Sequence, residues 1–180
     1  MKNKKIVFLG DSITECYNLE KFYPEFNVLN KGKSGDTTVD ILNRLDESIF
    51  KVNPNVVILL IGANDLELLS STSEEVIKNI KEIVKRIKGF NKAIDLYLLS
   101  VYPVNYPIKP FSVGKRTNKD INTINDAIKK IKEVTYIDVA STLKDENGEL
   151  NKEYTYDGLH MSLRGYEVIT EVLRKKIFGF

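Results

Sequence analysis

The stretch Lys5-Ile6-Val7-Phe8-Leu9-Gly10-Asp11-Ser12-Ile13-Thr14 decides how the rest of this chain is interpreted. Its four consecutive apolar residues, 6–9, predict a short β-strand that is buried on both faces. Gly10 ends the apolar run, so Ser12 is expected at the carboxyl end of that strand, where ligands bind in open α/β sheets. On its own, Gly-Asp-Ser is more typical of a turn in which Asp11 or Ser12 caps the next helix. The other motifs of the chain change that interpretation.

The composition is that of an ordinary globular domain. The chain has 180 residues, of which 42% are apolar and 29% charged, and this length is enough for one domain with a hydrophobic core. The net charge of +2 results from 27 basic and 25 acidic residues. No long basic block is present, which argues against a nucleic-acid partner and against a polybasic membrane mode. We therefore expect a single domain over residues 1–180.

The sequence pattern predicts neither a signal peptide nor a Cys/His metal cluster. The basic amino terminus is followed by an apolar run that ends at Leu9, which is too short for a signal peptide. No apolar stretch is long enough to cross a bilayer, so we expect no membrane insertion and, unless a leader has been removed, a cytoplasmic protein. Cys16 and His160 are the only residues of their types, which excludes an internal disulfide and a Cys/His metal cluster. Cys16 is expected to be a small buried residue.

Apolar periodicity predicts five alternations of strand and helix. Beyond the first strand, strands are expected over 26–30, 56–61, 94–101 and 134–138, and helices over 39–52, 76–87, 121–131 and 163–177. The third of these strands, 56–61, consists of six apolar residues and is predicted to be central. Thr72 and Glu75 form a capping-box pattern, Gly89 is a plausible helix C-cap, and the proline-rich segment after Tyr102 is expected to be irregular and not helical. This alternation predicts one three-layer αβα domain with a mostly parallel five-stranded sheet.

Three successive strands end in loops that contain glycine and polar residues. These loops are Gly10-Asp11-Ser12, Gly32-Lys33-Ser34-Gly35-Asp36 and Gly62-Ala63-Asn64-Asp65. Parallel strands place all three loops at the same edge of the sheet. Each loop alone is ordinary turn chemistry, but together they predict a cleft with a hydroxyl group, free backbone N–H groups and a side-chain amide.

The segment Tyr156-Asp157-Gly158-Leu159-His160 adds an acid and a base to this cleft. Taken alone, Asp157 is a turn residue and His160 a surface residue. Together with Ser12 they supply the parts of a serine-hydrolase mechanism, in which Asp157 orients the imidazole and His160 activates the hydroxyl. The backbone N–H groups of Ser12 and Gly35 and the side-chain amide of Asn64 are the candidate oxyanion donors, each typically worth about 3–4 kcal/mol of barrier.

In these four blocks the chain strongly resembles the SGNH hydrolases, the GDSL-like esterase and lipase superfamily. Gly10-Asp11-Ser12 matches the first block, with Ile13 in place of the usual leucine, and Asp157-x-x-His160 matches the last. The second and third blocks are matched by the glycine loops that carry Gly35 and Asn64. The resemblance implies a flavodoxin-like sheet, hydrolysis of acyl esters through an acyl-enzyme, and no metal or organic cofactor. The Gly-x-Ser-x-Gly elbow of the α/β-hydrolases is absent.

The residues around the expected cleft are less informative. Asp11, Asp36 and Asp65 are interpreted as loop-shaping residues whose carboxylates bond nearby backbone N–H groups, and Asp11 is also a candidate for substrate binding. Further candidates beside the cleft include Tyr102 and Tyr156, although packing explains each of them at least as well. The same is true of the aromatic residues Tyr106, Phe111 and Tyr154, and Lys115, Arg116 and Asn118 look no different from solvated polar residues.

We expect a serine esterase whose partner is a small-molecule acyl ester with a short acyl or acetyl group, because the chain leaves little room for a lid beyond 103–115. The alternatives are a lysophospholipase or thioesterase that acts on longer acyl chains and, more remotely, a non-enzymatic flavodoxin-like module that binds a phosphate or flavin. The sequence leaves the oligomeric state open.

Overall fold

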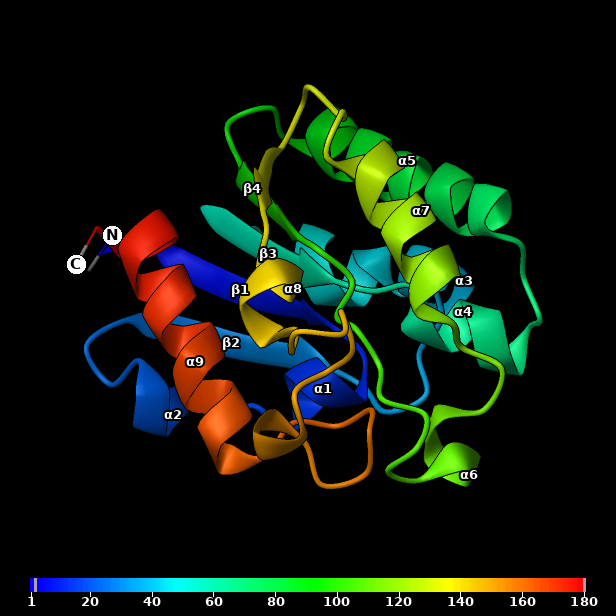
Figure 1. Cartoon of the computed structure of the whole chain (residues 1–180). Coiled ribbons are helices and arrows are strands. Elements are labelled where there is room, and N and C mark those ends of the chain that lie inside the picture. The colour runs from blue at the N-terminus through cyan, green and yellow to red at the C-terminus, as the bar shows by residue number, and fades with distance from the viewer. Residues whose placement is uncertain (2, 180) are drawn as a thin grey trace.

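The sheet that the sequence predicts is present, and all of its neighbouring strands run parallel. The computed structural model describes residue 1 and residues 3–179. Its strands are β1 (Lys5–Gly10), β2 (Asn27–Gly32), β3 (Val56–Leu60), β4 (Asp95–Leu99) and β5 (Thr135–Ile137), in the order β2-β1-β3-β4-β5. This order places β3 in the middle of the sheet, between β1 and β4, and confirms the predicted α/β class (Figure 1).

Helices cover both faces of the sheet (Figure 1). They are α1 (Ser12–Glu15), α2 (Leu19–Phe22), α3 (Thr38–Asn43), α4 (Ala63–Leu68), α5 (Ser73–Phe90), α6 (Pro110–Val113), α7 (Asn118–Ile128), α8 (Ala140–Leu143) and α9 (Leu163–Leu173). π-Helical turns occupy Asp46–Phe50 and Arg174–Phe178, and a 3-10 turn occupies Lys152–Tyr154. Apolar residues of α3, α4, α5 and α7 form one core, and those of α1, α2, α8 and α9 form the other.

The alternation of side chains along β1 divides it between these two cores. Val7 and Leu9 pack on the side of α5, whereas Ile6 and Phe8 pack on the side of α9. All four are almost completely buried, as predicted for a strand covered on both faces. The sheet is therefore held by apolar burial along its whole centre, and its polar loops gather at the carboxyl ends of the strands.

Three expectations about the helices need correction. α5 continues through Gly89 to Phe90, whose ring stacks on that of Phe50, so Gly89 is not the helix cap. The proline-rich segment contains the short helix α6, which begins at Pro110 because the first position of a helix needs no backbone N–H. The expected helix over 39–52 is interrupted at Arg44, after which the chain continues as the π-helical turn.

Cys16 is exposed and not buried as predicted, because it follows the last residue of the short helix α1 and lies beyond the core. Over the residues that the structure describes, no helix combines the length and the apolar character that crossing a bilayer requires.

Candidate active site

Ser12 is the first residue of α1 and follows β1 after a single residue, Asp11. The Asp11 carboxylate accepts a hydrogen bond from the backbone N–H of Ile13 at 3.0 Å and so caps this helix. A Cβ atom at Gly10 would lie 2.4 Å from the carbonyl oxygen of Leu60 on β3. Only glycine allows the chain to turn from the strand directly into the helix this close to the sheet, and this turn presents the hydroxyl at the strand edge.

His160 lies beside Ser12 although 148 positions separate them in the chain. The Nε2 atom of the imidazole is 3.1 Å from Ser12 Oγ, and Nδ1 is 2.8 Å from Asp157 Oδ2. The Asp157 side chain is 8% exposed and that of His160 29% exposed. The three side chains thus form a chain of contacts from a buried carboxylate to a hydroxyl group that solvent can approach.

The Asp157 carboxylate is ionised and determines which nitrogen carries the imidazole proton. Burial raises the pKa of Asp157, but hydrogen bonds from the His160 side chain and from the backbone N–H groups of His160 and Leu159 outweigh burial, and the net pKa lies below its usual value. An ionised carboxylate only accepts hydrogen bonds, so Nδ1 carries the proton in the neutral imidazole. Nε2 is then free to accept the hydrogen bond from the Ser12 hydroxyl.

The turn that carries Asp157 and His160 is held against the segment after β4. The backbone N–H of Asn105 donates to the carbonyl oxygen of Gly158 at 2.8 Å. Gly158 has a φ of +83°, and a Cβ atom there would lie 2.1 Å from the Asn105 carbonyl oxygen. Both the left-handed conformation and the close approach require glycine at this position.

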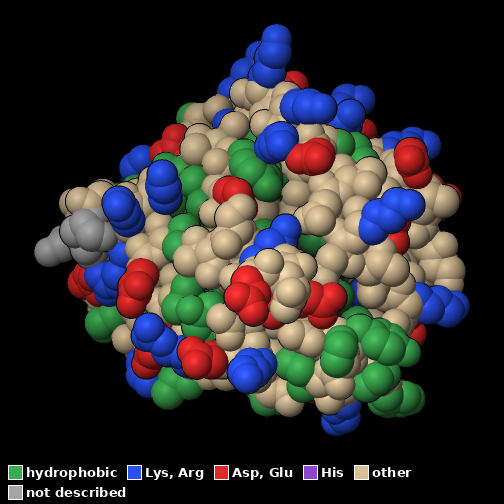
Figure 2. Space-filling view, in the orientation of Figure 1, with side chains coloured by type: hydrophobic (Ala, Val, Ile, Leu, Met, Phe, Trp, Pro, Cys, Tyr) green, Lys and Arg blue, Asp and Glu red, His purple; other side chains and the backbone are tan. Residues whose placement is uncertain are grey.

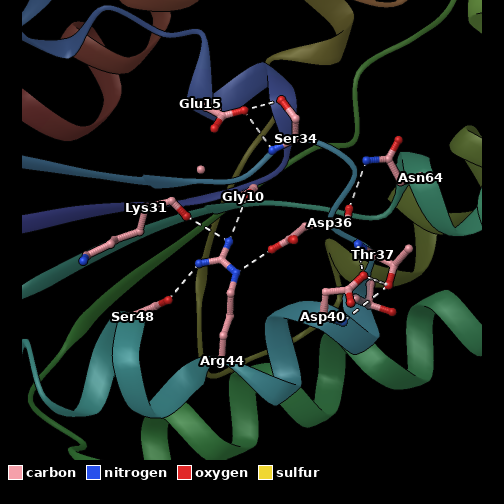
Figure 3. Close-up of polar contacts among 12 residues, drawn as sticks. Gly10, Glu15, Lys31, Ser34, Asp36, Thr37, Asp40, Arg44, Ser48 and Asn64 are labelled. Carbon is pink, nitrogen blue, oxygen red and sulfur yellow. Dashed lines mark hydrogen bonds and ion pairs between the residues drawn. The ribbon is translucent and has the colours of Figure 1, made fainter.

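Arg44 ties the ends of β1 and β2 to the loop that carries Gly35 (Figure 3). Its guanidinium group donates to the carbonyl oxygens of Gly10 at 3.0 Å and Lys31 at 2.9 Å, and pairs with the Asp36 carboxylate. Asp36 therefore shapes its loop through a side-chain ion pair and not, as expected, through neighbouring backbone N–H groups.

Asp65, which was expected to shape its loop, and Gly35, a candidate oxyanion donor, lie in different surroundings. The Asp65 carboxylate accepts hydrogen bonds from the backbone N–H and the hydroxyl group of Thr38, so it joins α4 to the start of α3. Gly35 has a φ of +83° and an exposed backbone, and nothing lies within 4 Å of a Cβ built there. Glycine is favoured at that position because of the left-handed backbone conformation, and not because a side chain would lack space.

Asn64 lies in the first turn of α4 and not in the loop before it, because α4 begins at Ala63. Its amide Nδ2 donates to the carbonyl oxygen of Asp36 at 3.0 Å, which places the side chain beside the Gly35 loop (Figure 3). Its Oδ1 accepts a hydrogen bond from Arg116 Nη2 at 2.8 Å. The three glycine loops are thus joined to one another by specific hydrogen bonds at one edge of the sheet.

The tyrosines proposed for substrate binding lie in different surroundings. Tyr156 is 65% exposed and its ring is parallel to the imidazole of His160, with 6.0 Å between the ring centroids. Tyr102 is 4% exposed and packs in the core on the side of α9, so the structure does not bring it to the surface of the cleft. Tyr106 and Phe111 are exposed on the segment around α6.

Sequence reasoning did not identify the roles of Arg44 and Arg116. Arg116 is 6% exposed and is therefore not the solvated charge that the sequence suggested. Nothing in the local pattern marks either residue, because the neighbours of an arginine in the sequence do not show whether its guanidinium group faces solvent or binds backbone carbonyl oxygens. A single sequence offers no signal for contacts of this kind.

Comparisons with known proteins agree with this fold. Residues 8–168 match the sequence model of the GDSL-like Lipase/Acylhydrolase family. The chain is 31% identical over 166 residues to the N-acylneuraminate cytidylyltransferase of Escherichia coli O18:K1:H7, covering 91% of this chain and 38% of that protein, so it spans about two fifths of that relative.

Two other proteins are similar over most of their length. The human platelet-activating factor acetylhydrolase IB subunit alpha2 is 25% identical over 181 residues, which covers 98% of this chain and 77% of that protein. The solved structure of a lipase/acylhydrolase from Enterococcus faecalis is 25% identical, superposes with a TM-score of 0.82, and covers 98% of this chain and 96% of the other. The matches therefore extend across all of the elements that carry the site.

Proposed function

The chain belongs to the GDSL-like lipase/acylhydrolase family and is a carboxylic ester hydrolase, and from this premise we propose that it cleaves short-chain acyl esters, acetyl esters above all, with Ser12, His160 and Asp157 as its catalytic residues. The observation that carries this proposal is the continuous contact from Ser12 Oγ through the imidazole to the Asp157 carboxylate, at 3.1 Å and 2.8 Å. The non-enzymatic binding module is set aside, because the chain belongs to a family of enzymes.

In the first half of the reaction, Ser12 Oγ attacks the carbonyl carbon of the ester while His160 Nε2 takes the hydroxyl proton. Asp157 holds the Nδ1 proton and stabilises the imidazolium. When the tetrahedral intermediate collapses, the imidazolium returns its proton to the departing alkoxide, and an alcohol and an acyl-enzyme result. In the second half, water attacks the acyl carbon and passes a proton to His160, and the imidazolium returns that proton to Ser12 Oγ as the bond from Oγ to the acyl carbon breaks and the carboxylic acid leaves.

The negative charge that forms on the carbonyl oxygen requires donors at the same edge of the sheet. We assign this role to the backbone N–H groups of Ser12 and Gly35 and to the side-chain amide of Asn64. The hydrogen bond from Asn64 Nδ2 to Asp36 supports the assignment, because it holds the amide beside Gly35 and leaves its second N–H available. Removal of one such donor typically lowers kcat by about 10²–10³-fold.

A short acyl group is supported by the small size of the segment that could cover the site and by the name of the human relative, an acetylhydrolase. The alternative of a lysophospholipase or thioesterase on longer acyl chains is favoured by a specific observation. Tyr106, Ile108 and Phe111 are 53%, 37% and 94% exposed, and hydrophobic side chains gather over α6 on this face of the molecule (Figure 2). Such a patch suits an apolar chain or a lipid surface.

Two measurements test the proposal. A fluorophosphonate probe is expected to label Ser12 in the wild-type protein and to leave the Ser12→Ala variant unlabelled, and that variant is expected to be inert towards p-nitrophenyl acetate. Rapid turnover of this ester by Ser12→Ala would refute the mechanism. A comparison of acetyl, octanoyl and palmitoyl esters then decides the chain length, since a strong preference for the palmitoyl ester would exclude the short-chain assignment.

A further inference from the structure

Arg116 is a charged side chain buried next to the expected oxyanion site. It is 6% exposed, and burial lowers the pKa of its guanidinium group from the usual value, against the opposing charges of Glu67, Asp11 and Asp157. Among the residues that the structure describes, it forms no ion pair within 4 Å. A guanidinium buried without a paired carboxylate is costly unless other acceptors satisfy its N–H groups.

The acceptors that satisfy it come from two elements. Nε donates to the carbonyl oxygen of Ala63 at 2.9 Å, and Nη1 donates to those of Val113 at 2.9 Å and Ser112 at 3.3 Å. The remaining contact is to a side chain, since Nη2 donates to Asn64 Oδ1 at 2.8 Å. Arg116 therefore joins the end of α6 to the first turn of α4 and reaches the amide that we assign to the oxyanion site.

This contact determines which way the Asn64 amide faces. A guanidinium group only donates hydrogen bonds, so the atom that faces it must be the amide oxygen. The Asp36 carbonyl oxygen only accepts hydrogen bonds, so the atom that faces it must be the nitrogen. With both ends assigned, one N–H of Nδ2 is bound to Asp36 and the other remains available to a substrate oxygen.

The charge of Arg116 also strengthens that donor. A hydrogen bond from a cation to an amide oxygen polarises the amide, because the electron density withdrawn towards oxygen leaves the N–H groups more positive. In a buried site, where water does not screen the charge, this effect is larger than at the surface. The guanidinium thus acts on the oxyanion without touching it.

We propose that Arg116 is a positioning residue for catalysis, which fixes the orientation of the Asn64 amide and increases its strength as an oxyanion donor. This inference rests on the oxyanion role proposed for Asn64. A simpler role, in which Arg116 only anchors α6 to α4, makes a different prediction. If Arg116 is only an anchor, its replacement lowers kcat equally with and without the Asn64 amide. If it is a positioning residue, its replacement no longer lowers kcat once the amide has been removed.

A double-mutant cycle separates the two roles. Arg116→Ala is expected to lower kcat on p-nitrophenyl acetate by about 10–100-fold with little change in KM, less than the loss from deletion of the donor itself. In the Asn64→Ala background, the same substitution is expected to have almost no further effect on kcat. The matched control is Arg174→Ala, which removes an arginine at the end of α9 that binds Glu25 and the Phe22 carbonyl oxygen, and kcat is expected to stay unchanged.

Each outcome has a distinct meaning. Equal losses from Arg116→Ala in both backgrounds would overturn the inference and leave only an anchor. Unchanged kcat in Asn64→Ala would refute the oxyanion role itself, and the premise of this inference with it. If Arg116→Ala fails to fold, Arg116→Lys replaces it in the cycle, because lysine keeps the charge but cannot serve all four acceptors. The Asn64 side-chain amide signal in NMR spectra should move in either folded variant, and an unmoved signal would also contradict the proposal.

Discussion

Asp157 has two tasks that a single substitution can separate. Its Oδ1 accepts hydrogen bonds from the backbone N–H groups of Leu159 and His160, whereas Oδ2 faces the imidazole. Asp157→Asn keeps an oxygen for the turn but turns an amide N–H towards Nδ1, which favours the tautomer with the proton on Nε2. Nε2 can then no longer accept the Ser12 proton, so kcat is expected to fall by about 10³–10⁴-fold.

Steady-state kinetics on a soluble acetyl ester measure this loss. Thermal unfolding serves as the control, because the backbone hydrogen bonds of the turn remain and the midpoint should move little. Turnover by Asp157→Asn within tenfold of wild type (~1.4 kcal/mol of barrier) would contradict the assigned role.

The pKa of Asp11 predicts how the free energy of unfolding depends on pH. Burial raises the pKa of this carboxyl group to about 6, despite the hydrogen bond from the Ile13 N–H, whereas an unfolded chain has an aspartate pKa of about 4. Between about pH 4 and about pH 6 the unfolded chain has therefore lost a proton that the folded protein retains. The contribution of Asp11 to the free energy of unfolding falls as pH rises through this range, and its charged form is destabilising above it.

Asp11→Asn keeps the oxygen that caps α1 and removes the titration. Relative to wild type, the variant should gain stability as the pH rises from about 4 to about 7, by up to about 1.4 kcal/mol for each unit of pKa shift. Urea unfolding of both proteins across that range measures the difference. Parallel stability curves for the two proteins would show that the carboxyl group titrates normally in the folded state.

At the scale of elements, the turn that carries Asp157 and His160 depends on its packing against the segment after β4. Gly158→Ala places a methyl group 2.1 Å from the Asn105 carbonyl oxygen in a left-handed conformation, so the turn must move. Because Asp157 and His160 lie in this turn, both the melting temperature and kcat are expected to fall. Calorimetry and turnover of p-nitrophenyl acetate measure the two effects.

Gly148 provides the matched control. It has a similar φ of +79°, but nothing lies within 4 Å of a Cβ built there. Gly148→Ala should cost only the conformational strain, about 1–2 kcal/mol, and leave kcat unchanged. If Gly158→Ala matched this control in both measurements, close packing of the turn would not be what holds His160 in place.

At the scale of the whole molecule, the fold brings together segments from both ends of the chain. The carboxyl ends of β1, β2 and β3 meet because the strands are parallel, and the segment after β5 returns His160 to the same edge (Figure 1). The two apolar cores on either side of the sheet stabilise this arrangement, and the polar contacts at its edge orient the side chains of the site.

The sequence by itself determined the architecture and the family, because both depend on local patterns. The apolar run 56–61 predicts a strand covered on both faces, and four motifs in the right order identify an acylhydrolase. Sequence reasoning was also able to nominate Ser12, His160 and Asn64, since the residue types suited to catalysis are few. It was less reliable for helix ends, as Gly89 and Pro110 demonstrate, because capping depends on what the last turn packs against.

Only the tertiary structure decided which polar residues are buried and what they bind. Arg44 and Arg116 have no local signature, yet both are held by carbonyl oxygens from segments distant in the chain. The distance from Ser12 to His160 and the orientation of the Asn64 amide likewise depend on contacts between different elements. The physical reason is that a hydrogen bond between distant residues depends on the folded positions of both partners, which no pattern within one segment records.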